Sequence, residues 1–352
     1  AYTTIKKPSD YFNTKLYTGD GTSNQSITGV GFQPDFTWLK IRSDSHFHNL
    51  FDVIRGVNKA LVSDDSGAEH TDDQYGWLSS FDSDGFTTQD GSNATHWSVN
   101  KSGDTYASWN WKANGAGSAN TDGSISSTVS ANTTSGFSIV SYTGTGSAAT
   151  IGHGLGVSPA CIIIKNTSDS GGVDWFVYHQ STGATNRTKL NQTVASATSS
   201  FINNTTPSPT VFNTEGGGAS GVNANNYIAY CFAEKQGYSK FGSYTGNGNA
   251  DGTFVYTGFK PAFVMIKRTD TGDNWLIKDI KRDPINQMEK RIFPNLSNAE
   301  DTGSGGNYDF LSNGFKLRES DAIGNASGGT YIYMAFAEAP LVGTNNVPCT
   351  AR

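Results

Sequence analysis

The sequence predicts an all-β protein made of three tandem, related units. Hydrophobic residues make up 35% of the chain and charged residues 16%, while glycine occurs 41 times and Phe, Trp and Tyr together reach 12%. Low charge, abundant aromatic residues and turn formers at short intervals are typical of many short strands around packed cores. A disordered chain would be charged and poor in aromatic residues. A length of 352 residues fits two or three domains better than one core.

A repeated motif, Y-T-G-x-G, sets the number of units at three. A proline follows its tyrosine by 17 residues in every copy, and a lysine follows that proline by six; the three sets are Tyr17, Pro34 and Lys40, Tyr142, Pro159 and Lys165, and Tyr244, Pro261 and Lys267. Spacings that recur in this way indicate one structural unit used repeatedly. We therefore expect repeats at 1–113, 137–236 and 237–340, a Gly/Ser/Thr-rich connector at 114–136, and a C-terminal tail at 341–352.

The first half of each unit predicts three strands. The first strand covers 11–17, 137–142 or 238–244 and ends in Y-T-G-x-G, which we interpret as a tight hairpin turn because its glycines allow positive φ. The strand after the proline covers 36–40, 161–165 or 263–267 and is apolar at both parities, so both faces should be covered. A middle strand carries a bulky pair, which we align as Leu50-Phe51, Trp175-Phe176 and Trp275-Leu276.

The second half of each unit predicts a hairpin and a closing strand. Asp84-Gly85-Phe86 and Asn313-Gly314-Phe315, with a loose equivalent near Phe212, suggest type I′ turns. The closing strands cover 106–111, 227–232 and 331–336. Alternation along the first of them places Ala107, Trp109 and Trp111 on one large face that packs into a core, and leaves the opposite face partly covered.

The connecting segments differ among the units. Unit one inserts 63–74, with four aspartates, and unit three inserts 283–291, which is compatible with a helix; both are expected to be surface loops. The connector 114–136 is either a flexible linker or a segment that lies against a neighbour, and Ile125 and Val129 favour the second interpretation.

Charge and hydropathy exclude several classes of partner. A net charge of −6 gives no electrostatic reason to bind nucleic acid or an anionic membrane. No apolar run approaches the ~20 residues that cross a bilayer, and the first residues lack the apolar segment of a signal peptide. We therefore expect no membrane insertion and synthesis in a cytoplasm. Cys161 and Cys231 lie within apolar strands and should be buried thiols.

Parts of all three units resemble a family of virion proteins of marine tailed bacteriophages. The stretches that carry the resemblance are 31–36, 50–56, 154–159, 237–246, 331–340 and 347–352. Members infect marine bacteria such as cyanobacteria and are usually labelled tail fibre or lectin-like proteins. The resemblance implies a jelly-roll or concanavalin-like β-sandwich in each unit and a structural or host-attachment role in the virion.

The same resemblance implies a set of partners. Other virion proteins come first, and host surface polysaccharide is the alternative that a receptor-binding lectin would require. Tail fibre, short spike, capsid decoration and head fibre all remain open as positions. Such proteins usually act as symmetric oligomers, so a homotrimer is the first expectation and a pseudo-threefold monomer the second.

Several polar residues of unit one are candidates for a metal site or for catalysis. His46 and His48 with Asp44, and His70 with Asp72 and Asp73, offer ligands for a divalent metal. The alternative is a solvated loop, and we expect neither a metal nor another cofactor. Two pairs, Asp64-Asp65 and Asp72-Asp73, could flank a glycosidic bond, although adjacent aspartates also serve simply as solubilising groups.

The chain shows no recognised catalytic motif. It contains no G-x-S-x-G, no H-E-x-x-H and no phosphate-binding loop, so we expect binding rather than enzymatic activity. Trp77 and Trp97 lie outside the repeated pattern and could stack on sugar rings, with core packing as the alternative. The candidate binding residues are therefore His46, His48, Asp72, Asp73, Trp77 and Trp97.

Overall fold

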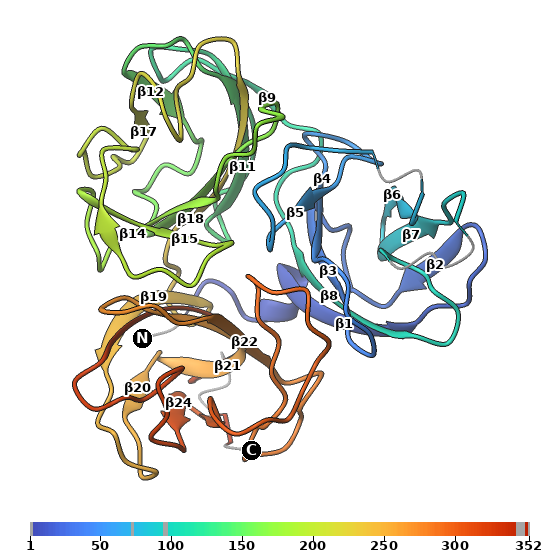
Figure 1. Cartoon of the computed structure of the whole chain (residues 1–352), viewed down its shortest axis with the longest axis vertical. Helices are drawn as coiled ribbons and strands as arrows, with labels where there is room; N and C mark the ends of the chain where they lie inside the picture. The colour runs from blue at the N-terminus through green and yellow to red at the C-terminus, as the bar shows by residue number, and fades with distance from the viewer. Residues whose placement is uncertain (1–2, 72–73, 94–97, 343–348, 351–352) are drawn as a thin grey trace.

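The protein folds into three lobes arranged around a common centre (Figure 1). The computed structural model describes residues 3–71, 74–93, 98–342 and 349–350. Lobe one contains β1 to β8, lobe two β9 to β18 and lobe three β19 to β25, and each lobe pairs a large antiparallel sheet with a small one. The predicted all-β class is confirmed. No helix in the described ranges has both the length and the hydropathy to traverse a lipid bilayer.

The strand order shows the common plan of the lobes. The large sheet of lobe one contains, in spatial order, β1 (Phe12–Thr18), β8 (Thr105–Trp111), β3 (Phe36–Ile41), β4 (Asn49–Asp52) and β5 (Leu61–Val62), and its small sheet contains β2 (Gln25–Thr28), β7 (Gly85–Gln89) and β6 (Trp77–Asp82). The large sheet of lobe three contains β19 (Ser239–Thr245), β25 (Thr330–Pro340), β21 (Phe259–Arg268) and β22 (Trp275–Asp279), and its small sheet contains β20 (Phe254–Tyr256), β24 (Gly314–Leu317) and β23 (Tyr308–Leu311).

Lobe two extends the same plan with additional strands. Its large sheet contains β16 (Ala197–Thr198), β15 (Asn186–Lys189), β14 (Phe176–His179), β13 (Cys161–Asn166), β18 (Asn226–Phe232), β11 (Phe137–Thr143), β10 (Ser127–Asn132) and β9 (Ser118–Asn120), and its small sheet contains β12 (Ala149–Gly152) and β17 (Val211–Thr214). The stretch 114–136, expected to be a connector, thus supplies β9 and β10. Val129 is buried in the core of lobe two, and Ile125 packs against that core.

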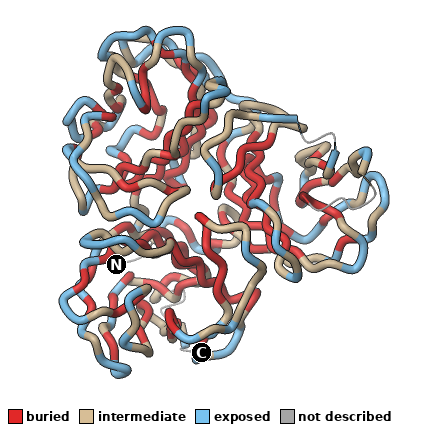
Figure 2. The backbone as a smooth tube through the Cα atoms, viewed as in Figure 1, coloured by how far each residue is buried: buried red, intermediate tan, exposed pale blue. Residues whose placement is uncertain are grey.

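The closing strands β8, β18 and β25 are buried on both faces. Their large side chains, among them Trp111, Phe232 and Phe336, form one hydrophobic core to which all three lobes contribute. Figure 2 shows these buried strands facing the centre of the molecule. The opposite face, predicted to be only partly covered, is also fully buried, since Ser108 and Asn110 are 0% exposed. The reason is that each lobe stacks its small sheet against its large one, which a single strand's alternation does not reveal.

The Y-T-G-x-G motif does not form a hairpin. It leads the chain from β1 of the large sheet to β2 of the small sheet, and the same step leads from β11 to β12 and from β19 to β20. A Cβ atom on Gly144 would lie 2.3 Å from the carbonyl oxygen of Val222, and Gly19 and Gly246 have equivalent contacts of 2.3 Å. The motif is thus a corner between the two sheets. Its first glycine permits this corner to approach the loop before the closing strand.

The tyrosine of each motif stacks on a tyrosine of the closing strand. Ring centroids lie 4.9 to 5.1 Å apart with interplanar angles of 8 to 10°, in the pairs Tyr17–Tyr106, Tyr142–Tyr227 and Tyr244–Tyr331. Cross-strand aromatic pairs of this kind stabilise a sheet and fix its register. The fixed sequence spacings thus locate strands of the large sheets and the segments that lead from each large sheet to its small sheet.

Three further expectations need correction. The hairpins β6–β7 and β23–β24 exist, but neither Asp84 nor Asn313 adopts the positive φ that a type I′ turn requires. Residues 283–291 form no helix, because Met288 and Arg291 make isolated bridges to Tyr308 and Asp301 instead. Pro261 lies within β21 rather than before it, where a register shift accommodates it.

Candidate binding site

The repeated lysine of each lobe connects that lobe to a neighbouring one. Each is fully buried, and its Nζ donates to one carbonyl of its own lobe and to one of the preceding lobe, with lobe three preceding lobe one around the ring. The pairs of acceptors, at 2.5 to 3.0 Å, are His46 and Ser297 for Lys40, Val173 and Ser66 for Lys165, and Asp273 and Thr193 for Lys267. Burial lowers the pKa of each lysine to about 8. The lobes therefore close on one another in a cyclic pattern.

His48 belongs to a second cyclic set of contacts. Strand register places Asn49, Phe176 and Leu276 at equivalent positions, so the predicted alignment of Leu50-Phe51 with the tryptophan pairs is wrong by two residues. His48 is the true equivalent of Trp175 and Trp275. The two indoles donate Nε1–H to carbonyls of the preceding lobe, Val62 at 2.7 Å and Lys189 at 2.8 Å.

The ring of His48 has the same structural role as those indoles. Its Nδ1 accepts the indole N–H of Trp38 at 2.9 Å, which leaves Nε2 to donate to the carbonyl of Phe293 in lobe three at 3.1 Å. Burial lowers the pKa of His48 well below its usual value. His48 is therefore a neutral interface group rather than a ligand for a metal or a sugar.

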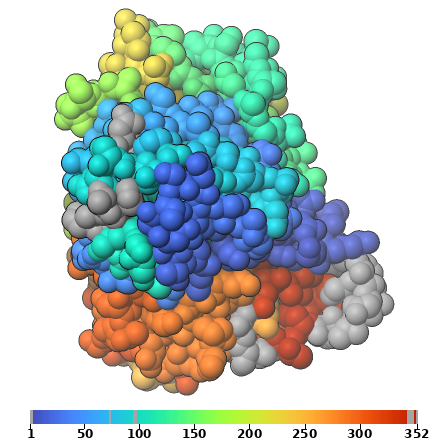
Figure 3. Space-filling model, turned by 90° about the vertical axis from the view of Figure 1, so that its right-hand side faces the viewer, coloured from blue at the N-terminus to red at the C-terminus, as the bar shows by residue number. Residues whose placement is uncertain are grey.

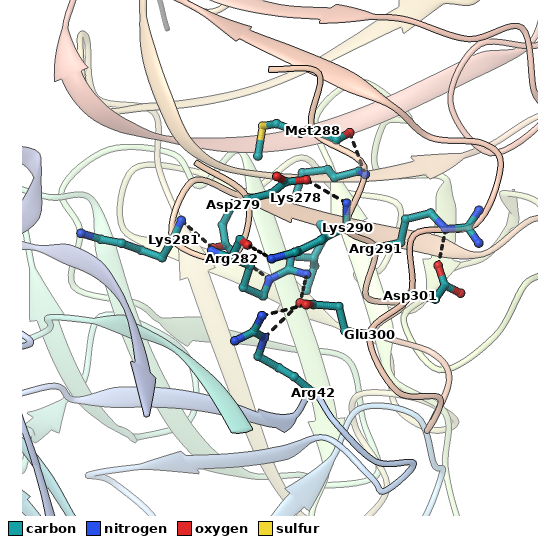
Figure 4. Close-up of polar contacts among 12 residues, drawn as sticks. Arg42, Lys278, Asp279, Lys281, Arg282, Met288, Lys290, Arg291, Glu300 and Asp301 are labelled. Carbon is teal, nitrogen blue, oxygen red and sulfur yellow. Dashed lines mark hydrogen bonds and ion pairs between the residues drawn. The ribbon is translucent and has the colours of Figure 1, made fainter. Parts of the chain in front are cut away.

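The contact between lobes one and three also contains a charged cluster (Figure 4). Glu300 accepts two hydrogen bonds from Arg42, at 3.1 and 2.7 Å, and a third from Arg282 at 3.1 Å. Arg282 also pairs with buried Asp279, which accepts the indole N–H of Trp109 at 3.0 Å. Burial alone would raise the pKa of Glu300, but the two arginines lower it below its usual value. These charges are satisfied within the fold.

A pocket of about 420 Å³ opens among the loops of lobe one. It lies between the segments before β4 and before β6, and its described lining consists of His46, Phe47, Asn49, Val62, Asp65, Gly67, Ala68, His70, Thr71, Gln74, Tyr75 and Ser98. Its volume falls within the range of about 300 to 1,000 Å³ that is typical of small-molecule sites. In Figure 3 lobe one faces the viewer, between lobe two above and lobe three below.

Aromatic rings form one side of this pocket. The ring of His46 lies 5.5 Å from that of Phe47 and 5.5 Å from that of Tyr75, both in edge-on geometry. Phe47 is 46% exposed although it is large and apolar. The backbone below these rings is fixed, because Lys40 binds the carbonyl of His46 and Asn49 donates to the carbonyl of Phe47 at 3.3 Å.

The loop on the other side of the pocket is held by both neighbouring lobes. Ser63 donates its hydroxyl to the carbonyl of Pro294 in lobe three at 2.7 Å, and the amide of Glu69 donates to the carbonyl of Thr167 in lobe two at 2.9 Å. Between them, the carbonyl of Ser66 accepts from Lys165. The described part of the insertion expected to be a plain surface loop, residues 63–71 and Gln74, is thus an interface element on one side and a pocket wall on the other.

The structure separates the predicted site residues. His46 lines the pocket, whereas His48 does not. Trp77 lies at the start of β6 and packs, partly buried, against the core of lobe one. Asp72, Asp73 and Trp97 lie outside the described residues. Phe47 and Tyr75 also line the pocket but were not predicted from the sequence, in which their only signal is their position in segments where unit one differs from the other units.

The two aspartates weighed for glycoside hydrolysis have different environments. Asp64 is partly buried, desolvation raises its pKa to about 6, and it accepts the backbone N–H of His48 at 3.0 Å. Asp65 is exposed and lines the pocket. Among the described residues, no group of three or more His, Cys, Asp or Glu side chains is arranged to hold a metal ion. The described lining offers aromatic rings, hydrogen-bond donors and acceptors, and one exposed carboxylate.

Comparison with known families gives one match, which covers nearly the whole chain. Residues 7–340 match a family described as a domain of unknown function (DUF7483). Searches of curated proteins and of solved structures found no match.

Proposed function

We propose that this chain, which belongs to the DUF7483 family, is a structural component of a tailed-bacteriophage particle and works by binding. Its partners would be neighbouring virion proteins or the surface of the host cell, and it would be made in the host cytoplasm before assembly. The resemblance of 237–246 and 331–340 to marine phage virion proteins supports this proposal.

One structural observation carries the proposal of binding rather than catalysis. The buried histidine, lysines and acids described above are bound to carbonyls, arginines or indoles at the contacts between lobes. Perturbed pKa values often mark catalytic groups, but ion-pair and interface networks produce them as well. The lobe-one pocket, in contrast, is formed by the loops that differ among the units. Variable loops on a rigid scaffold are where proteins usually place recognition.

The depolymerase alternative requires two carboxyl groups that flank a bond at a defined separation. Asp65 lines the pocket, but Asp64 is turned to the backbone of His48. The described pocket therefore provides one of the two groups, and binding is the function that we propose.

The test is to locate the chain in purified particles. Quantitative mass spectrometry of intact phage should find it at a fixed copy number, and immunogold labelling should place it on the head or the tail. Purified protein should also bind host cells and slow phage adsorption if it contacts the host. A chain that is abundant in infected cells but absent from purified particles would contradict the proposal.

A further inference from the structure

We infer that the lobe-one pocket is a binding site for an uncharged sugar, as one or two rings of a larger saccharide. This inference deepens the proposed function and rests on it for the origin of the sugar, which would be the host surface. The pocket is small for a peptide or nucleic acid partner, whose interfaces extend well beyond one hollow. At about 420 Å³ it matches the small-molecule range.

The aromatic side of the pocket suits a pyranose ring. A sugar presents C–H groups on one face, and these pack on aromatic surfaces. Phe47 is nearly half exposed, and the ring of Tyr75, which also lines the pocket, lies 5.5 Å from that of His46. Phe47 thus leaves apolar ring surface accessible at the pocket, where the C–H groups of a sugar could pack.

The polar groups of the pocket suit hydroxyls. Asp65 supplies carboxylate acceptors, while Gln74 and His70 supply groups that can donate and accept. A sugar hydroxyl does both, so it can use each of them. The described lining contains no lysine or arginine. An acidic sugar or a phosphate would therefore meet a carboxylate without a compensating cation, which disfavours anionic ligands.

The pocket walls are held in place before any ligand binds. Contacts from lobe two reach Ser66 and Glu69, and a contact to lobe three holds Ser63. A preformed site loses less conformational entropy on binding than a loop that must be ordered. Single sugar units bind with few contacts, so this saving matters more here than in a large interface.

A hollow of similar volume in lobe three provides the matched control. It is lined by Tyr256 and by residues that include Lys240 and Glu234, which form an ion pair. Tyr256 is 58% exposed. Replacing it removes an exposed aromatic ring of comparable size far from the lobe-one pocket.

The experiment screens the purified full chain on an array of neutral, amino and acidic oligosaccharides, and then titrates the strongest neutral oligosaccharide by calorimetry. Wild-type protein should bind neutral sugars in preference to acidic ones. Phe47→Ala should weaken binding by about two- to tenfold, which is the effect expected for one aromatic contact. Asp65→Asn should weaken it as well, whereas Tyr256→Ala should leave it unchanged, and all variants should keep the wild-type melting temperature.

Three results would overturn the inference: no neutral sugar binds, acidic sugars bind better, or Tyr256→Ala weakens binding while Phe47→Ala does not. Particle composition, measured separately, distinguishes this failure from failure of the proposed function. A chain that is found in virions but binds no neutral sugar refutes the pocket's assignment alone. A chain that binds sugar through Phe47 but is absent from virions refutes the virion role alone.

Discussion

His179 shows how single residues join the lobes. Its Nδ1 accepts the backbone N–H of Ser181 at 3.2 Å, and its Nε2 donates to the carbonyl of Tyr333 in lobe three at 3.1 Å. It occupies the position that Asp52 and Asp279 have in the other two lobes, as the strand register shows. The residue at this position differs among the lobes, but each contacts the following lobe: Asp52 accepts from Tyr230 of lobe two, and Asp279 accepts from Trp109 of lobe one.

Acid should weaken this contact. Burial lowers the pKa of His179 to about 4, below the roughly 6.5 of an unfolded histidine. The unfolded chain therefore takes up the proton first as the pH falls, and stability that is present above pH 6.5 is lost between about pH 6.5 and 4. The slope is about 1.4 kcal/mol per pH unit for one proton, or about 3 kcal/mol across this window. Urea unfolding at several pH values measures it.

The matched variants isolate the effect from other titrating groups. His179→Gln should show a shallower loss of unfolding free energy between pH 6.5 and 4 than wild type does. His70→Gln, which changes an exposed histidine, should follow the wild-type curve. Parallel curves for wild type and His179→Gln would show that His179 does not contribute.

Residues of the candidate site that look alike in the sequence have different roles in the structure. His46 and His48 form an H-x-H pair, yet one lines a pocket and the other replaces a tryptophan at a lobe interface. The sequence alone could not separate them, because the distinction depends on which carbonyl a neighbouring lobe presents. Phe47 was overlooked for a related reason: an aromatic residue is expected to be buried, and only the structure shows that it is exposed.

At the level of elements, the repeated Y-T-G-x-G segment was easy to locate from its spacing, but its role as a corner between two sheets was not predicted. The fixed spacing from tyrosine to proline to lysine correctly located the strand before each motif and the strand after each proline, including the doubly buried β3 and β13. It did not reveal that consecutive strands lie in different sheets, because glycine-rich turns occur both in hairpins and in crossings between sheets. In the small sheet of lobe two, the strand expected near Phe212 is β17, whereas its partner β12 was not predicted.

The first glycine of the corner should be irreplaceable. A Cβ atom on Gly144 would lie 2.3 Å from the carbonyl oxygen of Val222, so Gly144→Ala must displace backbone. We expect a loss of about 1 to 3 kcal/mol in unfolding free energy, as for other overpacked sites. Gly217, in the same lobe, has open space at its Cβ position and no positive φ. Gly217→Ala should therefore leave the urea midpoint unchanged, and equal midpoints for both variants would contradict the argument.

For the whole molecule, the central core makes the three lobes mutually dependent. The ring of Trp111 in lobe one lies 6.2 Å from Phe232 in lobe two and 5.6 Å from Phe336 in lobe three. Trp111→Ala should cost about 3 to 5 kcal/mol, the usual range for a buried tryptophan. Calorimetry should still show one transition, shifted to lower temperature, because the central core is covered only while all three lobes are packed together. Three separate transitions would show that the lobes unfold independently.

The same core leads to a prediction about assembly. The resemblance to phage virion proteins implies a homotrimer first, and the three similar units leave a pseudo-threefold monomer as the second possibility. Lys40, Lys165 and Lys267 each close a contact between two lobes of the same chain, and the aromatic faces of the closing strands meet within it. A trimer would usually bury such faces between subunits, whereas here one chain already covers them. We therefore expect dilute protein to sediment as a single chain of 37.5 kDa. A species of three times that mass, stable on dilution, would restore the homotrimer.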